Sequence, residues 1–336
     1  MRKLISVIIP NYNGEKFLCD CLESLLNQSY GNFEVIIVDN NSSDQSMNII
    51  DEIFFKCSNK YIFDQKKLSI IRNTENLGFS KAVNQGILAS KGSFVFLLNN
   101  DVILEEKCLA NLLNNISEDD NLFSVQAKMI QSKNRDLIDD AGDQYTILGW
   151  AYKRGDGSKN TNYTKNSEIF SSCAGAALYR KNLLDKIGYF DENFFAYMED
   201  VDLSYRAKIF GFKNMYCASA IVYHIGSATT GSKYNEFKVR LAAKNNILVP
   251  YKNMPLLQLL CNLPFLIIGF LIKYLFFFSN GYGKQFCTGT FEGINALRNV
   301  KKVEFKKNNM INYIRIEYEL IMNTIRYFFL KLKFKR

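Results

Sequence analysis

The segment that most constrains the fold is residues 94–101, which read F-V-F-L-L-N-N-D. Five consecutive apolar residues fit a strand that is buried on both faces, as strands are in parallel sheets. Three short polar side chains then end the run. Because ligands bind beyond the carboxyl ends of the strands in open α/β sheets, we expect chemistry at Asp101.

Three earlier apolar runs repeat this pattern. We expect strands over residues 4–10, 33–38 and 68–72, and helices over about 17–26 and 47–55. A third helix opens within the loop of residues 73–86 and runs to about residue 90. Asp39 ends the second strand as Asp101 ends the fourth. Residues 1–101 therefore read as β-α-β-α-β-α-β, a doubly wound α/β half that binds a nucleotide on a mostly parallel sheet.

The middle of the chain is more mixed. We expect a helix near residues 105–116, a strand over 123–130, a long loop or hairpin over 139–167, a strand over 169–179, helices over 183–187 and 198–210, and a strand over 220–224. The last strand leads to His224, the only histidine of the chain.

The C-terminal part has a different character. Residues 254–278 are strongly apolar and long enough to cross a bilayer of about 30 Å. Polar or helix-bending residues interrupt this run, at Gln258, Asn262, Pro264, Gly269 and Lys273. From residue 311 to 332, apolar residues recur at alternating steps of three and four, which predicts a basic amphipathic helix.

Charge is concentrated in the same region. Residues 301–336 contain ten Lys or Arg and three Glu, so they carry seven of the nine net positive charges of the chain. Each such cation contributes roughly 1 kcal/mol near an anionic leaflet. We therefore expect attachment to an anionic membrane surface rather than a true span, and no nucleic-acid groove. The alternative is a helical subdomain or dimer interface, as in a homo-oligomer.

Familiar nucleotide motifs are absent. No G-x-G-x-x-G follows the first strand and no G-x-x-x-x-G-K-[ST] occurs, so dinucleotide and P-loop sites lose their main support. Mg²⁺ or Mn²⁺ on Asp101 would hold a diphosphate instead, because these ions take hard oxygen ligands and bridge phosphate oxygens. Eight scattered cysteines without a C-x-x-C pair, and no cleavable signal pattern, indicate reduced cytosolic thiols.

Seven blocks together resemble the inverting glycosyltransferases of family 2, which have the GT-A fold. The blocks are S-V-I-I-P-N-Y-N-G, V-I-I-V-D-N-N-S-S-D, N-L-G-F-S-K-A-V-N-Q-G, F-L-L-N-N-D-V, C-A-G-A-A-L-Y-R, G-Y-F-D-E-N-F-F-A-Y-M-E-D-V-D-L-S-Y-R and Y-H-I-G-S. The resemblance covers about residues 4–250 and is nearest to the rhamnosyltransferase-like branch. It implies a GT-A domain over residues 1–240, with a nucleotide-binding half over 1–101 and an acceptor half over 102–240. Residues 241–336 would form a helical, membrane-associating region.

The resemblance assigns the donor side residue by residue. Walls of the nucleoside pocket would be Pro10, Asn11, Tyr12 and Asp39, and residues near the donor would be Asn76, Gly78 and Lys81. Gly78 lets backbone approach the donor, and the helix N-terminus after it favours the diphosphate. Asn99, Asn100 and Asp101 stand where the family has its D-x-D motif. The sequence departs from that motif at Asn99, so an amide replaces the first carboxylate, while Asp101 remains as the metal ligand.

The second half would supply the catalytic groups. Asp200 of the pair Glu199-Asp200 matches the family's general base, and His224 matches a second metal ligand. Weaker acceptor-side assignments fall on Trp150, Gly175 and Ala176. From the residues alone, acidic side chains favour the first turn of any helix, and a lone histidine that ends a strand is often structural.

These observations predict a metal-dependent inverting glycosyltransferase that is peripheral to the cytoplasmic face of the bacterial inner membrane or held there by a C-terminal helix. Its donor would be a nucleoside-diphosphate sugar, either dTDP-rhamnose or a UDP-sugar. Its acceptor would be a lipid-linked or growing surface polysaccharide such as O-antigen. The alternative is a catalytically silent scaffold that binds a sugar nucleotide within a glycan assembly complex.

Overall fold

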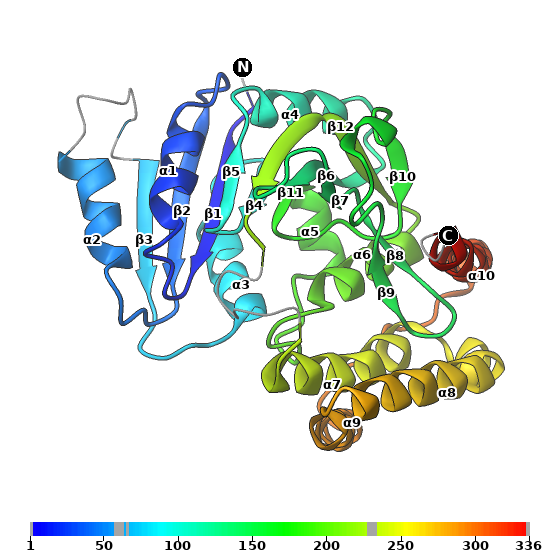
Figure 1. Cartoon of the computed structure of the whole chain (residues 1–336). Helices are drawn as coiled ribbons and strands as arrows, with labels where there is room; N and C mark the ends of the chain where they lie inside the picture. The colour runs from blue at the N-terminus through cyan, green and yellow to red at the C-terminus, as the bar shows by residue number, and fades with distance from the viewer. Residues whose placement is uncertain (1–2, 57–63, 65–66, 227–233, 334–336) are drawn as a thin grey trace.

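The computed structural model describes residues 3–56, 64, 67–226 and 234–333. Over this part of the chain, a ten-stranded sheet forms the centre, a short hairpin lies beside it, and long helices lie beyond its C-terminal half (Figure 1). Ser227, which ends the Y-H-I-G-S block, and residues 334–336 of the basic tail lie outside the described residues.

The sheet has the strand order β10-β12-β6-β11-β4-β1-β2-β3, with β5 on β12 and β7 on β6. The strands are β1 Ile5–Asn11, β2 Phe33–Asp39, β3 Leu68–Arg72, β4 Phe94–Leu98, β5 Val102–Leu104, β6 Leu122–Gln131, β7 Ile138–Asp140, β10 Ser167–Ile169, β11 Ala176–Arg180 and β12 Lys213–His224. Strands β1 to β4 are parallel, as predicted, and β11 is antiparallel to both of its neighbours. The predicted mixed α/β sheet is confirmed, but its mostly parallel character holds only for β1 to β4, because the second half of the sheet pairs mainly antiparallel.

Helices cover both faces of this sheet. They are α1 Leu18–Leu26, α2 Ser46–Asp51 with a π-helical turn Glu52–Lys56, α3 Phe79–Ala89, α4 Cys108–Ser117, α5 Lys181–Ile187, α6 Glu199–Ile209, α7 Glu236–Asn253, α8 Leu256–Ser279, α9 Gly283–Ala296 and α10 Met310–Lys333. Single 3₁₀ turns occur at Asn160–Asn162 and Lys307–Asn309. The apolar faces of α1, α2 and α4 form one core with the sheet, and those of α3, α5 and α6 form a second core on the opposite face.

One predicted strand matches the observed strand and another does not. Strand β4 ends at Leu98, as its apolar run predicts, and residues 99–101 form a turn. The single strand predicted over residues 169–179 is wrong, because β10 and β11 are separate. Between them, the amide of Cys173 donates to Gln126 Oε1 at 2.7 Å and the amide of Ala174 to Asp200 Oδ2 at 3.4 Å. Side chains thus take the hydrogen bonds that a neighbouring strand would otherwise provide.

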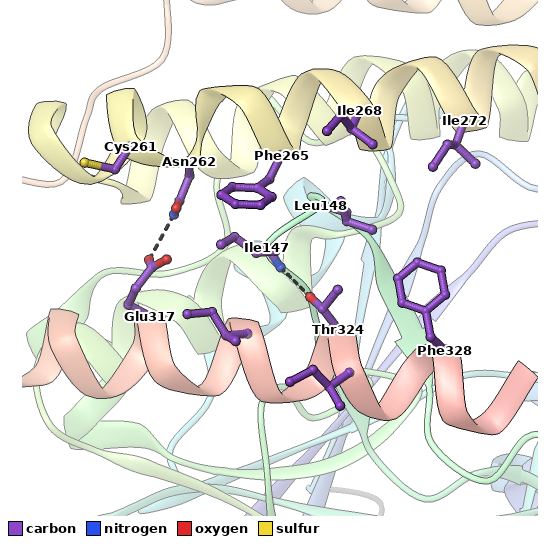
Figure 2. Close-up of a pocket in the computed structure, with 12 residues that line it drawn as sticks. Ile147, Leu148, Cys261, Asn262, Phe265, Ile268, Ile272, Glu317, Thr324 and Phe328 are labelled. Carbon is purple, nitrogen blue, oxygen red and sulfur yellow. Dashed lines mark hydrogen bonds between the residues drawn. The ribbon is translucent and has the colours of Figure 1, made fainter.

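The C-terminal helices share a core with the sheet domain. Strands β8 (Asp143–Tyr145) and β9 (Ala151–Lys153) form a hairpin, whose apolar residues pack with those of α6, α7 and α10. The tip of this hairpin lies between α8 and α10 (Figure 2). The domain boundary expected at residues 240/241 falls inside α7. The C-terminal helices therefore pack directly against the elements that carry the acceptor half.

Candidate active site

A chain of hydrogen bonds joins three strand ends at the carboxyl edge of the sheet. Asn11 and Asp39 are register partners on β1 and β2, and Asn11 Nδ2 donates to Asp39 Oδ1 at 2.9 Å. Asn100 Nδ2, beyond β4, donates to Asn11 Oδ1 at 2.8 Å. Ser42, which the sequence reasoning missed, donates its hydroxyl to Asp39 Oδ1 and its amide to Asp39 Oδ2. These buried contacts fix the carboxylate of Asp39 before any ligand arrives.

The loop before α3 is organised differently from the expectation. Gly78 has a φ of +84°, and a Cβ there would lie 2.6 Å from Phe195 Cδ2, so protein rather than donor occupies the space beside it. The Phe79 amide donates to the Phe195 carbonyl at 2.7 Å, and the Ser80 hydroxyl donates to the Phe194 carbonyl. The N-terminus of α3 is therefore covered by the segment before α6. Asn76 and Lys81 remain exposed beside it, as does Tyr12 next to Asn11.

Asp101 and His224, the two residues assigned to the metal, lie close together. Register pairing of β12 with β5 sets His224 opposite Val102, and His224 Nε2 lies 3.4 Å from Asp101 Oδ2. The other ring nitrogen, Nδ1, lies 2.8 Å from Asp139 Oδ2, which also pairs with Lys153 at 2.8 Å. Burial lowers the pKa of His224, but its two carboxylate partners raise that pKa more, to about 9.

This arrangement fits a divalent cation. A carboxylate oxygen and an imidazole nitrogen face each other, while a second carboxylate holds the far ring nitrogen, which is how proteins orient metal-binding histidines. Asp139 was missed by the sequence reasoning, which treated residues 139–167 only as a polar loop. The adjacent acids Asp139 and Asp140 in that loop were the available signal.

A second group of potential ligands lies nearby. Ligand atoms of Asp140, Asp143 and Cys173 all lie within 4.8 Å of one another. Burial raises the pKa of the Cys173 thiol well above its ordinary value, so the thiol is neutral. A thiol also suits soft metals better than Mg²⁺ or Mn²⁺. Asp101 and His224 are therefore the better match to the expected ions.

Asp200 has the surroundings of a general base. Its Oδ1 accepts the Val201 amide at 2.8 Å and its Oδ2 accepts the Ala174 amide at 3.4 Å. Burial raises the pKa of Asp200 to about 6, and the nearby Asp140 charge adds to the rise, while the backbone amides oppose it. Burial and the charge of Asp200 also raise the pKa of Glu199 well above its ordinary value. The pair thus divides into a neutral Glu199 and an Asp200 that is charged at neutral pH.

A strained turn sets Asp200 in place. Tyr197 and Met198, just before α6, have φ angles of 69° and 66°, which non-glycine residues seldom adopt. Asn245 of α7 stabilises the turn, because its Nδ2 donates to the carbonyls of Ala196 and Tyr197 at 2.9 and 2.6 Å. Helix α7 therefore holds the turn that positions Asp200.

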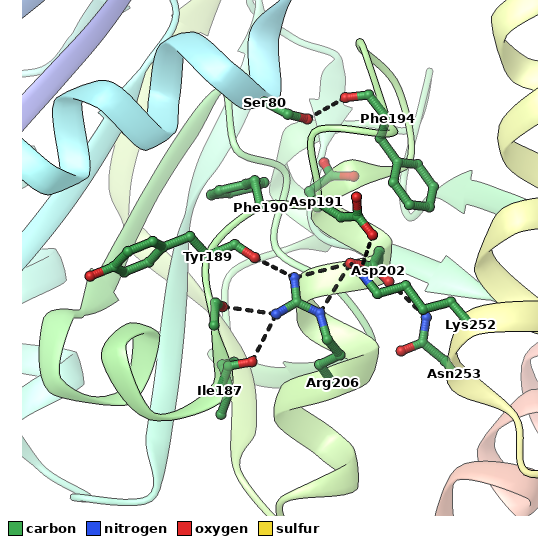
Figure 3. A network of polar contacts seen from close by, with 12 residues as sticks. Ser80, Ile187, Tyr189, Phe190, Asp191, Phe194, Asp202, Arg206, Lys252 and Asn253 are labelled. Carbon is green, nitrogen blue, oxygen red and sulfur yellow. Dashed lines mark hydrogen bonds and ion pairs between the residues drawn. The ribbon is translucent and has the colours of Figure 1, made fainter. Parts of the chain in front are cut away.

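A polar network around Asp202 of α6 extends this support (Figure 3). Arg206 of α6 donates to the carbonyls of Ile187, Gly188 and Tyr189 and pairs with Asp202 at 3.0 Å. Lys252 of α7 pairs with Asp202 at 2.9 Å and with Asp191 at 2.6 Å. Apart from the i,i+4 pair of Asp202 and Arg206 on α6, these contacts join partners that are far apart in the chain, so no local sequence signal predicted them.

The three residues assigned to the acceptor side, Trp150, Gly175 and Ala176, do not all lie together. A Cβ on Gly175 would lie 3.0 Å from Asn99 Nδ2, so Gly175 and its neighbour Ala176 lie beside the altered motif position. Trp150 lies elsewhere: it is buried, donates from Nε1 to the Gly269 carbonyl of α8 at 3.0 Å and stacks edge-on with Tyr327 of α10. Its contacts are those of a residue that joins the hairpin to the C-terminal helices.

Comparisons with known proteins agree on one family. The family model described as "Glycosyl transferase family 2" matches residues 6–188. The glycosyltransferase GlyG of Streptococcus pneumoniae serotype 4 is 32% identical over 120 residues, which are 36% of this chain and 37% of that protein. Poly-beta-1,6-N-acetyl-D-glucosamine synthase of Staphylococcus aureus (strain COL) is 26% identical over 242 residues, which are 71% of this chain and 53% of that protein. The chain thus spans about a third to a half of the length of these curated relatives.

Solved structures share the architecture. GalNAc-T7 with UDP, GalNAc and Mn²⁺ aligns with a TM-score of 0.59 and 17% identity over 74% of this chain and 48% of that chain. The mannosyltransferase PcManGT from Pyrobaculum calidifontis, with GDP-Man and Mn²⁺, aligns with a TM-score of 0.55 and 12% identity over 88% of both chains. At these identities the likeness shows the fold alone.

Proposed function

Since this chain belongs to glycosyltransferase family 2 and has the GT-A fold, we propose that it is an inverting, metal-dependent glycosyltransferase of bacterial surface polysaccharide synthesis. The observation that carries the proposal is the surroundings of Asp200, a buried carboxylate whose pKa is raised to about 6 and whose oxygens are oriented by backbone amides. The reaction would join an acceptor hydroxyl to the anomeric carbon of the donor sugar and release a nucleoside diphosphate.

Asp200 would take the proton of that hydroxyl. A base works best when its pKa lies near the operating pH, because it is then ionised and still basic enough to accept the proton. The neutral Glu199 beside it adds no competing charge. A positioned base of this kind typically contributes about 10²- to 10⁴-fold to the rate.

The donor would lie along the carboxyl edge of the sheet. Asp39 would accept a hydrogen bond from the nucleobase of the donor, and Pro10, Asn11 and Tyr12 would form the pocket walls. The hydrogen bonds that already orient the Asp39 carboxylate support this role. Asn99 and Asn100 would offer amides to the sugar or ribose in place of the usual first carboxylate. Asn76 and Lys81 would lie nearer the diphosphate.

Asp101 and His224 would hold the metal, with Asp139 fixing the ring of His224. When bound, such an ion neutralises the negative charge that develops on the leaving diphosphate. The imidazole ligand favours Mn²⁺ over Mg²⁺, since Mg²⁺ prefers oxygen ligands alone.

We place the protein at the cytoplasmic face of the membrane, with α8 lying along the surface. Leu256–Ser279 is long and apolar enough to span a bilayer. However, its polar side chains point into the protein: Gln258 and Asn262 donate to Glu317 of α10, and Lys273 donates to Asn246 of α7. A helix with one face committed to surface helices of the same chain suits an interfacial position. This location would give the protein access to a lipid-linked acceptor.

Nucleotide release from a donor panel tests the proposal. Full-length protein with Mn²⁺ and vesicles that carry lipid-linked acceptors would be offered dTDP-rhamnose and UDP-sugars, and the released nucleotide would be identified. We expect release from one donor, and loss of release in Asp101→Ala. The matched control is Asp156→Asn, because Asp156 is an exposed loop residue. Donor binding by calorimetry with no turnover across the panel would instead support the silent scaffold, and full turnover by Asp101→Ala would refute the metal site.

A further inference from the structure

An apolar groove runs between α8 and α10, with the tip of the β8–β9 hairpin as its floor (Figure 2). Its volume is about 610 Å³, within the usual range for ligand sites. In Figure 2, Phe265 and Ile268 of α8 face Phe328 of α10 across the opening, and Ile147 and Leu148 lie between the two helices.

Polar contacts set the width of this groove. Asn262 of α8 donates to Glu317 of α10 at 2.9 Å, and the amide of Ile147 donates to Thr324 Oγ1 of α10 at 3.1 Å. At the floor, a Cβ on Gly269 would lie only 2.2 Å from the Leu148 carbonyl, so a glycine allows α8 to rest on the hairpin. The groove is therefore a built feature of three elements.

The groove opens onto a large exposed apolar surface. Lining residues from both helices, such as Ile268 and Ile325, are about half exposed. Next to them, Leu257 of α8 and Ile314 of α10 point outward with exposed fractions of 75% and 59%. A large exposed apolar surface marks a partner or membrane site, and the net positive charge of residues 301–336 complements anionic lipid head groups.

The floor of the groove also leads to the acceptor side of the site. Ile147 lies four residues after Asp143, so the two are at most about 14 Å apart along the chain. Ligand atoms of Asp143, Asp140 and Cys173 lie within 4.8 Å of one another. Ala174, which follows Cys173, donates its amide to Asp200. The hairpin thus connects the hydrocarbon-like groove with the general base.

We infer that this groove binds the hydrocarbon chain of the lipid-linked acceptor, so that its glycan head reaches Asp200. This inference rests on the proposed function. The chain would enter from the bilayer face, where the groove is open, and the apolar walls of α8 and α10 would exclude water from it. Recognition would be by length and apolar character, since eight of the twelve lining residues are aliphatic or aromatic and Asn262, Glu317 and Thr324 already hydrogen-bond within the protein.

A photoreactive probe tests the inference. Full-length protein on vesicles with anionic lipids would be irradiated with a polyisoprenyl phosphate that carries a diazirine near its phosphate end, and adducts would be mapped by mass spectrometry. We expect adducts on groove residues of α8 and α10. Ile268→Asn should reduce them about tenfold and raise the KM for a long-chain acceptor by a similar factor, with no effect on a water-soluble short-chain acceptor.

The adjacent Ile267 provides a matched control. Ile267 and Ile268 are both 50% exposed, but only Ile268 lines the groove. Ile267→Asn should leave adducts and KM unchanged, while vesicle binding of the two variants should be alike. Equal adduct loss in both variants, or adducts only on outward residues such as Leu257, would overturn the inference. Failure of the proposed function is distinct, because donor turnover would then be missing with short-chain acceptors as well.

Discussion

The proposed donor edge, at the carboxyl ends of β1, β2 and β4, and the proposed acceptor side, around Asp140 and Asp200, differ in how their polar groups are satisfied. At the donor edge, Asn11 serves Asp39 and Asn100 at once, and Ser42 supplies two more hydrogen bonds. On the acceptor side, Asp140 Oδ2 and Glu199 Oε2 have no hydrogen-bond partner among the described residues. The first region is complete without a ligand, whereas the second holds buried carboxylates that lack part of their normal solvation.

The directions of the pKa shifts follow this contrast. Asp44, in the turn after β2, has its pKa lowered, because hydrogen bonds from Ser46 and the Glu15 amide outweigh burial. Burial raises the pKa of Asp140 and, with the charge of Asp140, the pKa of Asp143. Hydrogen bonds thus hold Asp44 beside β2 in the charged form, while burial pushes Asp140 and Asp143 towards the protonated form.

The largest expected effect comes from Asp200→Asn. The amide cannot accept a proton, so kcat should fall by about 10²- to 10⁴-fold. Nucleotide affinity should be unchanged, because the donor edge lies on separate strands. Steady-state kinetics with calorimetric donor binding would measure both. A kcat within threefold of the wild type would refute the role of Asp200.

Asn11→Ala should have the reverse pattern of effects: weaker donor binding with a smaller change in kcat. It removes partners from the buried side chains of Asp39 and Asn100, which costs about 1 to 3 kcal/mol. If Asn11→Ala instead lowered kcat as strongly as Asp200→Asn, the division into a binding edge and a catalytic side would fail.

Stability should depend most on the network behind the acceptor side. Lys252→Met leaves Asp202, which is fully buried, with only Arg206 as a charged partner. Breaking a buried pair on one side costs about 3 to 5 kcal/mol, and we expect the lower end here because Arg206 remains. Urea unfolding would measure it. The exposed pair of Lys213 and Asp119 offers a control, since Lys213→Met should cost less than about 1 kcal/mol.

Asp139→Asn probes the metal arrangement. Loss of a partner that orients a ligand typically weakens metal affinity by about 10- to 100-fold. We expect the Mn²⁺ concentration for half-maximal activity to rise by that factor, with kcat restored at saturating Mn²⁺. Asp136→Asn, at an exposed position in the preceding loop, should leave the titration unchanged. A loss of kcat that excess Mn²⁺ does not restore would contradict a purely orienting role.

The sequence predicted the donor edge better than the acceptor side, for a physical reason. Asp39 and Asp101 end strands of a regular repeat, and parallel strand ends meet at one edge whatever the loops do. Asp139, Asn245 and Lys252 act through partners more than 45 residues away, brought together by β12 and α7. Gly78 shows the remaining limit: a close approach beside it was expected, but not that the neighbour is Phe195 of the same chain.

The pH dependence of kcat should report the burial of Asp200. The base must be ionised, and its pKa is raised to about 6, so activity should be maximal above about pH 7 and fall as the pH drops through 6. At pH 5, kcat at saturating Mn²⁺ should be about a tenth of the plateau. Asp140→Asn should move the midpoint downward, because the Asp140 charge contributes to the raised pKa. A midpoint near 4 in the wild type would show that Asp200 is solvated.

Glu199→Gln should have the smallest effect on catalysis. Burial first, and then the charge of Asp200, raise the pKa of Glu199 well above its ordinary value, so the folded protein holds the neutral acid. Glutamine copies that neutral shape, and kcat should change by less than about tenfold. A fall as large as that of Asp200→Asn would assign the base to Glu199.

Glu199→Gln should also change how the free energy of unfolding depends on pH. Because the folded state binds the Glu199 proton more tightly than the unfolded chain, wild-type stability falls as the pH rises above the ordinary pKa of about 4.3 towards the raised value. Glutamine carries no such proton. The free energy of unfolding of Glu199→Gln, relative to that of the wild type, should therefore be higher at pH 8 than at pH 5, as measured by urea unfolding. A constant difference between the two pH values would mean that Glu199 is not held neutral, and the acceptor side would then resemble the donor edge.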